Sequence, residues 1–511
     1  MSARDQMFEP SIEACAKSYE SGRPRLVFAR LIADLETPVS AFLKLSASRP
    51  GRAFLLESVE GGAMRGRYSM IGLDPDLVWR VFGGKAEINR RALVEPHAFE
   101  SCGEPPLISL RALIAESRIE EPEDLPPMAA GVFGYLGYDM VRQMERLGPA
   151  KPDPIGTPDA MLIRPTVMVV FDAVKEEIFV VTPLRPEAGA PFRAAYDRAL
   201  ERIDAVVATL EGPLAHDAVC ADPYLAAGEP RSNTDEKRFH EMVERAKDYI
   251  RAGDIFQVVL SQRFSAPFAL PAFSLYRALR RVNPSPFLCY LDFGPFQIVC
   301  SSPEILVRAR DGKVTIRPIA GTRWRGKTKE EDERLAADLL ADEKERAEHL
   351  MLLDLGRNDV GRVAKIGSVE VTDQFVVERY SHVMHIVSNV EGALDPAHDV
   401  IDALCAGFPA GTVSGAPKVR AMEIIDELET DKRGVYGGCI GYFGASGEMD
   451  TCIILRTSVV KDGVMHVQAG AGVVYDSDPA YEQRECVNKA QALFRAAEEA
   501  VRFATRSKRG Q

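Results

Sequence analysis

Short apolar stretches separated by turns fill the first part of the chain. Five of them have the length and the β-branched or aromatic content typical of strands: 52–58, 68–73, 131–139, 166–172 and 177–183. Helical periodicity follows at 189–211. Residues 212–236 are then rich in Pro, Gly, Asp and Ala, a composition typical of a linker.

The second half combines long helical patterns with strand patterns. Thr234 is the expected N-cap of an amphipathic helix, and residues 329–360 read as one long helix. Segments 437–444, 451–460 and 465–475 predict an antiparallel meander with turns at Ser446-Gly447 and Asp462-Gly463. A closing helix is expected at 478–504. Strands in runs with helices outside them favour an α+β fold over a parallel βαβ sheet.

Composition narrows the class of protein. The 511 residues carry a net charge of −12, which argues against nucleic acid as the main partner. No run of about 18 apolar residues predicts a membrane span, and the first residues lack the apolar core of a secretory signal. The nine cysteines are scattered without a C-x-x-C pair. They predict reduced thiols in a cytoplasmic protein, rather than disulfides or a zinc site.

Two acidic pairs have the spacing of one helix face. Glu345 and Glu348 share a face of the first long helix, and Glu482 and Glu485 repeat the spacing on the last helix. Four converging carboxylates would take up protons unless a cation lay among them, and Mg²⁺ prefers such oxygen ligands. Because the chain has 75 acidic residues, solvated helix faces remain the alternative explanation.

Glycines and arginines mark two further stretches. Gly321 follows an apolar strand and lies close to Arg317, Arg323 and Arg325, a pattern that predicts close approach to an anion. Ala320, directly before the turn, is small where a functional side chain would be expected.

Gly470 and Gly472 interrupt a later strand, which indicates either a bulge or close contact with a ligand. Arg456 lies among apolar residues and needs a carboxylate partner, either from a ligand or within the protein. The loop carrying Thr412 and Ser414 offers hydroxyl donors, although on its own pattern it is an ordinary turn.

In this order, the motifs resemble those of the chorismate-utilising enzymes, and in particular anthranilate synthase component I. The resemblance covers nearly the whole chain and rests on "LLESVEGG", "RGRYSMIG", "GVFGYLGYD", "GDIFQVVLSQRF", "NPSPF", "SSPEILVR", "PIAGTRWRG", "DEKERAEHLMLLDLGRNDVGRV", "HVMHIVSNVEG", "FPAGTVSGAPKVRAMEII", "GGCIGYFG", "DTCIILRT" and "GAGVVYDSDP".

The resemblance implies a large antiparallel β-sandwich flanked by helices, with an interleaved N-terminal regulatory region and the active site between the sheets. It implies a regulatory domain at 24–180, a helix and linker at 181–232, and a chorismate-binding catalytic domain at 233–505. Glu348 and Glu485 match the family's Mg²⁺ ligands, with Glu345 and Glu482 close behind them. The positions that match chorismate contacts are Gly321, Thr322, Tyr436, Arg456, Gly470, Ala471, Gly472 and Lys489.

The implied reaction is addition of ammonia at C2 of chorismate with loss of the C4 hydroxyl, followed by loss of pyruvate to give anthranilate. Glu304 matches the family's general acid, and His385 matches an active-site histidine that would assist elimination. Relatives that add water carry a lysine in place of Gln257, and relatives that make aminodeoxychorismate carry a nucleophilic lysine in place of Ala320. Both differences favour direct attack by ammonia.

The resemblance also implies partners. The chain contains no glutaminase sequence, so ammonia would come from a separate glutamine amidotransferase subunit. Ser58 matches the family's feedback site for tryptophan, with Pro286, Phe287 and Leu288 closing over the amino acid. The alternatives are aminodeoxychorismate synthase component I, which Ala320 disfavours, and a non-catalytic amino-acid sensor, which the intact glutamate pairs disfavour.

Overall fold

A computed structural model describes residues 8–60, 64–120, 122, 124–187, 189–214, 228–380 and 383–506. The strands are β1 (Arg25–Ile32), β2 (Ala53–Glu60), β3 (Met64–Phe82), β4 (Lys85–Asn89), β5 (Glu100–Ser101), β6 (Gly131–Leu136), β7 (Ala160–Asp172), β8 (Glu177–Leu184), β9 (Arg231–Ser232), β10 (Gln257–Pro267), β11 (Phe287–Asp292), β12 (Phe296–Ser302), β13 (Ile305–Arg310), β14 (Lys313–Ile316), β15 (Ile319–Trp324), β16 (Glu370–Arg379), β17 (Val383–Ala393), β18 (Gly415–Ala416), β19 (Cys439–Gly444), β20 (Met449–Ile453), β21 (Thr457–Lys461) and β22 (Val464–Val473).

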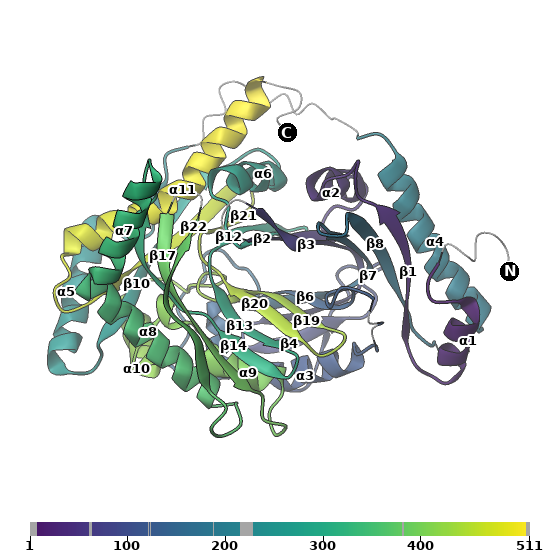
Figure 1. The fold of residues 1–511 in the computed structure, drawn as a ribbon, viewed down its shortest axis with the longest axis horizontal. Helices are drawn as coiled ribbons and strands as arrows, with labels where there is room; N and C mark the ends of the chain where they lie inside the picture. Colours follow the sequence, from purple (N-terminus) through teal and green to yellow (C-terminus); the bar gives the residue numbers. More distant parts are fainter. Residues whose placement is uncertain are drawn as a thin grey trace.

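The helices lie outside the strands (Figure 1). They are α1 (Ile12–Glu20), α2 (Pro38–Ser46), α3 (Pro106–Glu116), α4 (Phe192–Glu211), α5 (Glu236–Ala252), α6 (Ala272–Val282), α7 (Lys329–Ala341), α8 (Glu343–Gly361), α9 (Val400–Gly407), α10 (Lys418–Leu428) and α11 (Pro479–Arg506), with short 3₁₀ helices η2 (Tyr138–Gln143) and η3 (Gly411–Val413).

The strands form one continuous antiparallel system that folds into two layers. One layer runs β7–β3–β2–β11–β12–β21–β22–β10, and the other runs β6–β19–β20–β13–β14–β17. The long strand β7 joins them, because it pairs with both β3 and β6. The α+β sandwich is therefore confirmed. N-terminal β2 and β6 pair directly with C-terminal β11 and β19, so the two halves of the chain are interleaved.

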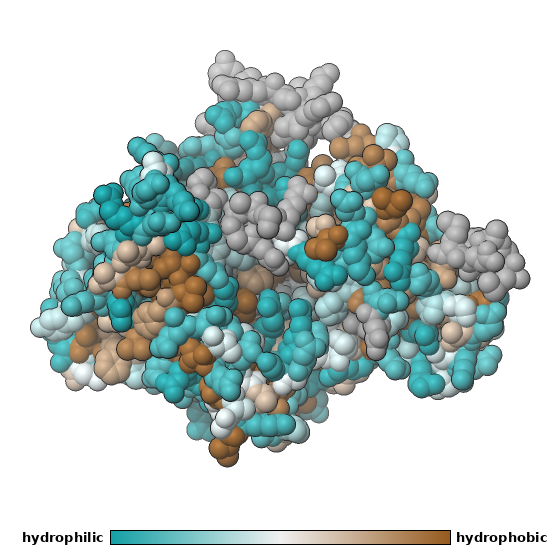
Figure 2. Space-filling view, viewed as in Figure 1, coloured by the Kyte–Doolittle hydropathy of each residue, from teal (hydrophilic) through white to brown (hydrophobic). Residues whose placement is uncertain are grey.

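The three largest apolar cores among the described residues pack the two layers and their helices. One lies between the layers and includes Phe54, Phe133, Ile298 and Ile440. The others lie under the helices on the outer faces: α1, α2, α4, α6 and α11 on one side, and α3, α5, α9 and α10 on the other. The outer surface in Figure 2 is mostly hydrophilic, with scattered hydrophobic areas. Within the described residues, no helix combines the length and the apolar character needed to cross a bilayer.

The helix predicted at 329–360 is in fact two helices. Asp342 separates α7 from α8 with an extended ψ of 112°, and its carboxylate accepts hydrogen bonds from the backbone N–H groups of Lys344 and Glu345. Asp342 also binds the guanidinium of Arg323 at 2.7 Å. Side-chain capping and this ion pair therefore override the helical pattern. A similar correction applies to α5, whose N-cap is Asp235 rather than Thr234.

The strand predicted at 451–460 also breaks. β20 ends at Ile453 and β21 begins at Thr457, and between them Arg456 has a φ of +50°. The predicted meander is present as two antiparallel hairpins, β19–β20 and β21–β22, but the break places them in different layers, where β20 also pairs with β13 and β21 with β12. The break turns the backbone at the one charged residue of this stretch, which lines the cavity described next. The centre of the predicted linker, 215–227, lies outside the described residues.

Candidate active site

A cavity of about 640 Å³ lies where β10 and β22 face β15 and β17, with α8 and α11 along its side. Apart from Ala471, every residue that the sequence suggested for catalysis, metal binding or chorismate binding lines it: Gln257, Glu304, Gly321, Thr322, Glu345, Glu348, His385, Tyr436, Arg456, Gly470, Gly472, Glu482, Glu485 and Lys489. Ala320 lines it too. The tertiary structure thus gathers segments that are more than 200 residues apart in the chain.

The two acidic pairs converge on this cavity, as their spacing predicted. Burial, together with repulsion from Glu345 and Glu485, raises the pKa of Glu348. Burial also raises the pKa of Glu482, against a hydrogen bond with Ser477 that lowers it. The Oε2 atom of Glu482 is buried without a hydrogen-bond partner. Carboxylates held in this way favour a cation beside them.

Two protein cations already lie beside the glutamates. Arg323 contacts Oε1 of Glu345 at 3.3 Å. The Nζ of Lys489 is 2.6 Å from Oε1 of Glu485 and donates to the carbonyl oxygen of Gly470 at 2.9 Å. Lys489 therefore connects the glutamate side of the cavity with strand β22. Lys489 and Arg323 therefore offset two of the four carboxylates, and among the described residues Glu348 and Glu482 have no protein cation within ion-pair distance.

The opposite part of the cavity carries Arg456 and the glycine strand. Among the described residues, the guanidinium of Arg456 makes no ion pair and no hydrogen bond to another side chain. The internal salt bridge considered from sequence is therefore wrong. An anionic ligand is the partner that remains. A Cβ added at Gly472 would lie 2.5 Å from Nε2 of Gln257, so the glycine permits close packing. The register of β10 with β22 is continuous, which excludes a bulge.

Ala471 is the exception among the predicted ligand contacts. Its side chain is fully buried in the core on the other face of β22, between Gly470 and Gly472. Successive residues of a strand point to opposite faces, so of these three residues only Gly470 and Gly472 face the cavity.

A buried carboxyl group with a strongly shifted pKa faces the cavity from the segment between β12 and β13. Burial raises the pKa of Glu304 to about 8, although the hydroxyl of Thr412 and the charge of Arg456 lower it. The Thr412 hydroxyl donates to Oε1 of Glu304 at 2.9 Å. Glu304 is therefore mostly protonated at pH 7 and can give up a proton. The loop of Thr412, interpreted from sequence as an ordinary turn, supplies this contact.

His385 is held as a neutral imidazole. Burial lowers its pKa, against a hydrogen bond to the carbonyl of Gly321 that raises it. That bond runs from Nδ1 to the Gly321 oxygen at 2.8 Å, so Nδ1 carries the proton and Nε2 keeps a free lone pair. Gly321 has a φ of +67°, which suits glycine. The edge of the His385 ring packs against Tyr380, with centroids 5.5 Å apart.

The arginines near Gly321 do not form the anion site that the sequence suggested. Arg317 pairs with Glu378, and Arg325 pairs with Asp332 at 2.7 Å. Arg323 binds Asp338, Asp342 and Glu345. Protein carboxylates satisfy all three guanidinium groups, so they brace β15 against α7, α8 and β16.

Further cavity residues were not identified from sequence. Gln468 lies two residues before Gly470 on the same strand face, and Tyr481 lies one helical turn before Glu485. The two-residue alternation of a strand would have indicated Gln468, and the 3.6-residue period of a helix would have indicated Tyr481.

Comparison with known proteins agrees with this geometry. Residues 80–495 match the family model described as chorismate binding enzyme. The chain belongs to this family. It is 58% identical over 502 residues to anthranilate synthase component 1 of Cereibacter sphaeroides, covering 98% of this chain and all of that one.

Comparison with solved structures extends the likeness to the fold. The crystal structure of anthranilate synthase component I from Streptococcus pneumoniae superposes with a TM-score of 0.76 at 39% identity, covering 91% of this chain and 98% of that chain. MenF, the menaquinone-specific isochorismate synthase of Escherichia coli, shares the fold at 20% identity with a TM-score of 0.69. The resemblance inferred from the motifs is confirmed.

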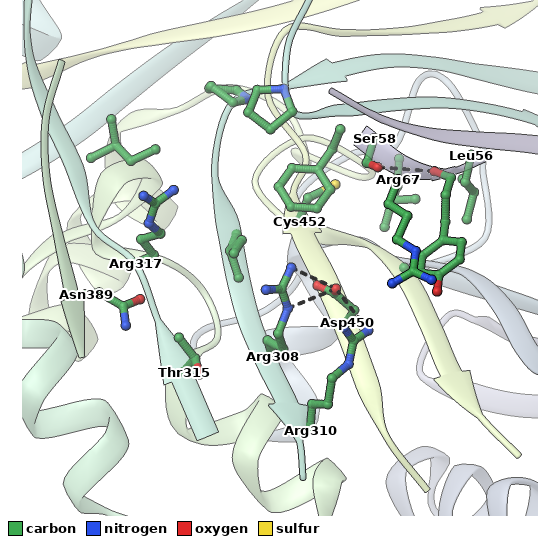
Figure 3. A pocket seen from close by; sticks show the side chains of 18 of the residues that line it. Leu56, Ser58, Arg67, Arg308, Arg310, Thr315, Arg317, Asn389, Asp450 and Cys452 are labelled. Atoms are coloured by element: carbon green, nitrogen blue, oxygen red, sulfur yellow. Dashed lines mark hydrogen bonds and ion pairs between the residues drawn. The ribbon is translucent and has the colours of Figure 1, made fainter. Parts of the chain in front are cut away.

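This chorismate binding enzyme has a second, larger cavity of about 1,210 Å³ (Figure 3). Ser58, Pro286 and Phe287, three of the residues expected at an amino-acid site, line it. Ser58 faces Phe287 across the β2–β11 pair, and its hydroxyl donates to the carbonyl of Tyr68 at 3.1 Å. Leu288 does not line the cavity, because its side chain is buried in the core on the opposite face of β11.

Proposed function

We propose that this chain aminates chorismate at C2 with ammonia and eliminates pyruvate, giving anthranilate. One observation carries the proposal: a single cavity joins an unpaired guanidinium, two pairs of glutamates, a protonated carboxyl group and a neutral imidazole. The relatives named anthranilate synthase component 1 support the choice of substrate and product. The overall change balances, since chorismate and ammonia give anthranilate, pyruvate and water.

Chorismate carries two carboxylates, and the two sides of the cavity suit them. The free guanidinium of Arg456, beside the backbone of Gly470 and Gly472, would bind the enolpyruvyl carboxylate. The ring carboxylate would then lie toward α8 and α11, where glutamates repel it unless a cation intervenes.

The glutamates fit a magnesium site by their chemistry. Glu348 and Glu485 would be ligands, with Glu345 and Glu482 behind them, and the unpartnered buried oxygen of Glu482 supports a missing cation. Bound Mg²⁺ would supply positive charge that orients and neutralises the ring carboxylate. Lys489 would stay close to Glu485, the carboxylate that it already contacts.

Glu304 supplies the proton for the first step. Ammonia forms the bond to C2 and loses a proton to become the amine, both ring double bonds shift, and the C4–O bond breaks. The carboxyl group of Glu304 protonates that oxygen, which leaves as water. Thr412 holds Oε1 of Glu304 at 2.9 Å and thereby orients the acid.

His385 is suited to the second step. Its free Nε2 can accept the proton from C2 while the C3–O bond breaks. The departing enolpyruvyl group takes up a proton and becomes pyruvate, and the ring becomes aromatic. The carbonyl of Gly321 fixes the required tautomer.

Gln257 and Ala320 favour ammonia as the nucleophile. Both line the cavity, and neither offers the amine that water activation or a covalent intermediate would use. Ammonia needs no general base to be nucleophilic. We further propose that a separate glutamine amidotransferase subunit supplies it, as the designation component 1 of the relatives supports.

We also assign the second cavity to tryptophan as a feedback inhibitor. Pro303 and Ile319 line both cavities, so a ligand in the second adjoins the wall of the first. Tyr380 lines the second cavity and packs on His385 of the first, which gives a physical route for coupling.

The test uses the purified chain with chorismate, Mg²⁺ and an ammonium salt, with fluorescence to detect anthranilate. Anthranilate should form with ammonium but not with glutamine alone, and the rate should depend on Mg²⁺. Accumulation of a non-aromatic aminated product would favour aminodeoxychorismate synthesis, and absence of any turnover would favour an amino-acid sensor.

A further inference from the structure

Three cysteines that are scattered in the sequence meet in the core between the two layers. Cys289 of β11, Cys300 of β12 and Cys452 of β20 are buried, and their sulfur atoms all lie within 4.8 Å of one another. No fourth His, Cys, Asp or Glu among the described residues joins the group. No pattern in the sequence indicated this group. The three thiols come from three different strands, so they show no local ligand spacing.

The strand register fixes this arrangement. Cys289 and Cys300 are directly opposite each other in the β11–β12 pair, so their side chains share a face. Cys452 comes from β20 in the facing layer. Each thiol therefore sits on a rigid element, and the group is part of the packed core.

We propose that Cys289, Cys300 and Cys452 form a binding site for a thiophilic d¹⁰ cation such as Zn²⁺. With metal–sulfur bonds of about 2.3 Å, sulfurs in a tetrahedral site lie about 3.8 Å apart, so closing the observed group requires shifts of about 1 Å or less. Three protein ligands leave a fourth position for solvent, as in open zinc sites.

The surroundings of the three thiols provide access from the larger cavity. Cys289 and Cys452 line the larger cavity, which opens a path for the ion and for a water. Figure 3 shows Cys452 among the residues that line this cavity. The Cys300 thiol also donates weakly to the carbonyl oxygen of Leu455 at 3.9 Å.

The test titrates the reduced full-length chain with Cd²⁺, which reports thiolate binding by charge-transfer absorption in the ultraviolet. One tight Cd²⁺ per chain is expected, with proton release and a rise in Tm, and Zn²⁺ should displace it. Cys300→Ala and Cys289→Ala should each lower the affinity at least about tenfold. Cys439→Ala, which removes an equally buried thiol of neighbouring β19 outside the group, should bind like the parent.

Two results would overturn the site. One is Cd²⁺ binding that is equal in the parent and both cluster variants, which would place the ion on other cysteines. The other is absence of tight binding while mild oxidant links Cys289 to Cys300, detected by peptide mass, which would make the group a redox pair.

Discussion

The two cavities share Pro303 and Ile319 as lining residues, but they differ in how far their charged side chains are paired within the protein. In the smaller cavity Arg456 has no carboxylate partner among the described residues, and Glu482 keeps a buried oxygen without a hydrogen bond. In the larger cavity most charged side chains are already paired: Arg308 binds Asp450 at 2.9 Å (Figure 3), and Glu57 binds Arg280 at 2.7 Å.

The difference fits the two proposed ligands. Chorismate is a dianion and needs countercharges that the protein has left free. Tryptophan is a zwitterion with no net charge, so a cavity with internally neutralised walls can hold it by shape and by a few polar contacts. The contrast predicts that substitutions of charged residues in the smaller cavity lower turnover, whereas those in the larger cavity leave turnover nearly unchanged.

The largest effect is expected at the acid. Glu304→Gln keeps an acceptor for Thr412 but removes the proton, so turnover should fall by about 10² to 10⁴-fold. At fixed free ammonia, turnover of the parent should decline as pH rises through about 8, because Glu304 ionises there beside Arg456 and Tyr380. Steady-state anthranilate fluorescence measures both. A parent profile that stays flat to pH 9 would remove Glu304 as the acid.

Removing a glutamate beside the proposed ion should have the next largest effect. Glu348→Gln or Glu485→Gln should reduce turnover by about 100-fold or more and weaken Mg²⁺ activation. Even substitution of residues that only hydrogen-bond to metal ligands typically lowers metal affinity or activity by about 10–100-fold. Glu391→Gln is the matched control, since Glu391 lines the larger cavity and pairs with Lys313. Equal Mg²⁺ titrations for the control and either variant would refute that ligand.

A larger side chain at Ala320 should also reduce turnover strongly. Ala320→Lys adds four methylenes and an amine where ammonia would approach, and we expect a loss of about 10²-fold from misplacement of the substrate. Ala320→Ser should lose far less, because it adds one small atom. Anthranilate production by the lysine variant at the parent rate would take Ala320 out of the active site.

The second cavity should respond in the opposite way. Ser58→Phe places a large ring beside Phe287, so tryptophan inhibition should be lost while uninhibited turnover stays within about twofold. Inhibition curves with and without tryptophan measure both quantities. Unchanged sensitivity would place the inhibitor elsewhere, and a large loss of uninhibited turnover would contradict the separation of the two cavities.

The smallest effect concerns stability. The pKa of Glu304 is raised by burial from an ordinary value near 4.5 to about 8. The contribution of the Glu304 carboxyl group to the free energy of unfolding is therefore complete below its pKa in the unfolded chain, and it is lost as pH rises through about 8. Glu304→Gln carries no charge, so its Tm should exceed that of the parent at pH 9 and lie closer to it at pH 6. Thermal unfolding at both values gives the comparison.

Local pattern went far in this chain. Periodicity predicted the helical spans of α4, α5, α7 with α8, and α11, together with strands that include β2, β6, β7, β8, β19 and β22. The acidic pairs that meet in the cavity were visible from their i,i+3 spacing. Alternation along a strand also contained information that was not used. It would have placed Ala471 and Leu288 on the opposite faces from Gly470 and Phe287, as the structure does.

Tertiary contacts decided the rest. Asp342 ends a helix that periodicity would have continued, because it caps α8 and binds Arg323, a residue 19 positions away. The arginines near Gly321 are paired while Arg456 is free, and no local rule distinguishes them. The three cysteines meet only because β11, β12 and β20 share one core. By itself the sequence determined which side chains could take part in chemistry. The tertiary structure decided which of them lie together and which charges have no protein partner, because contacts between distant segments determine both properties.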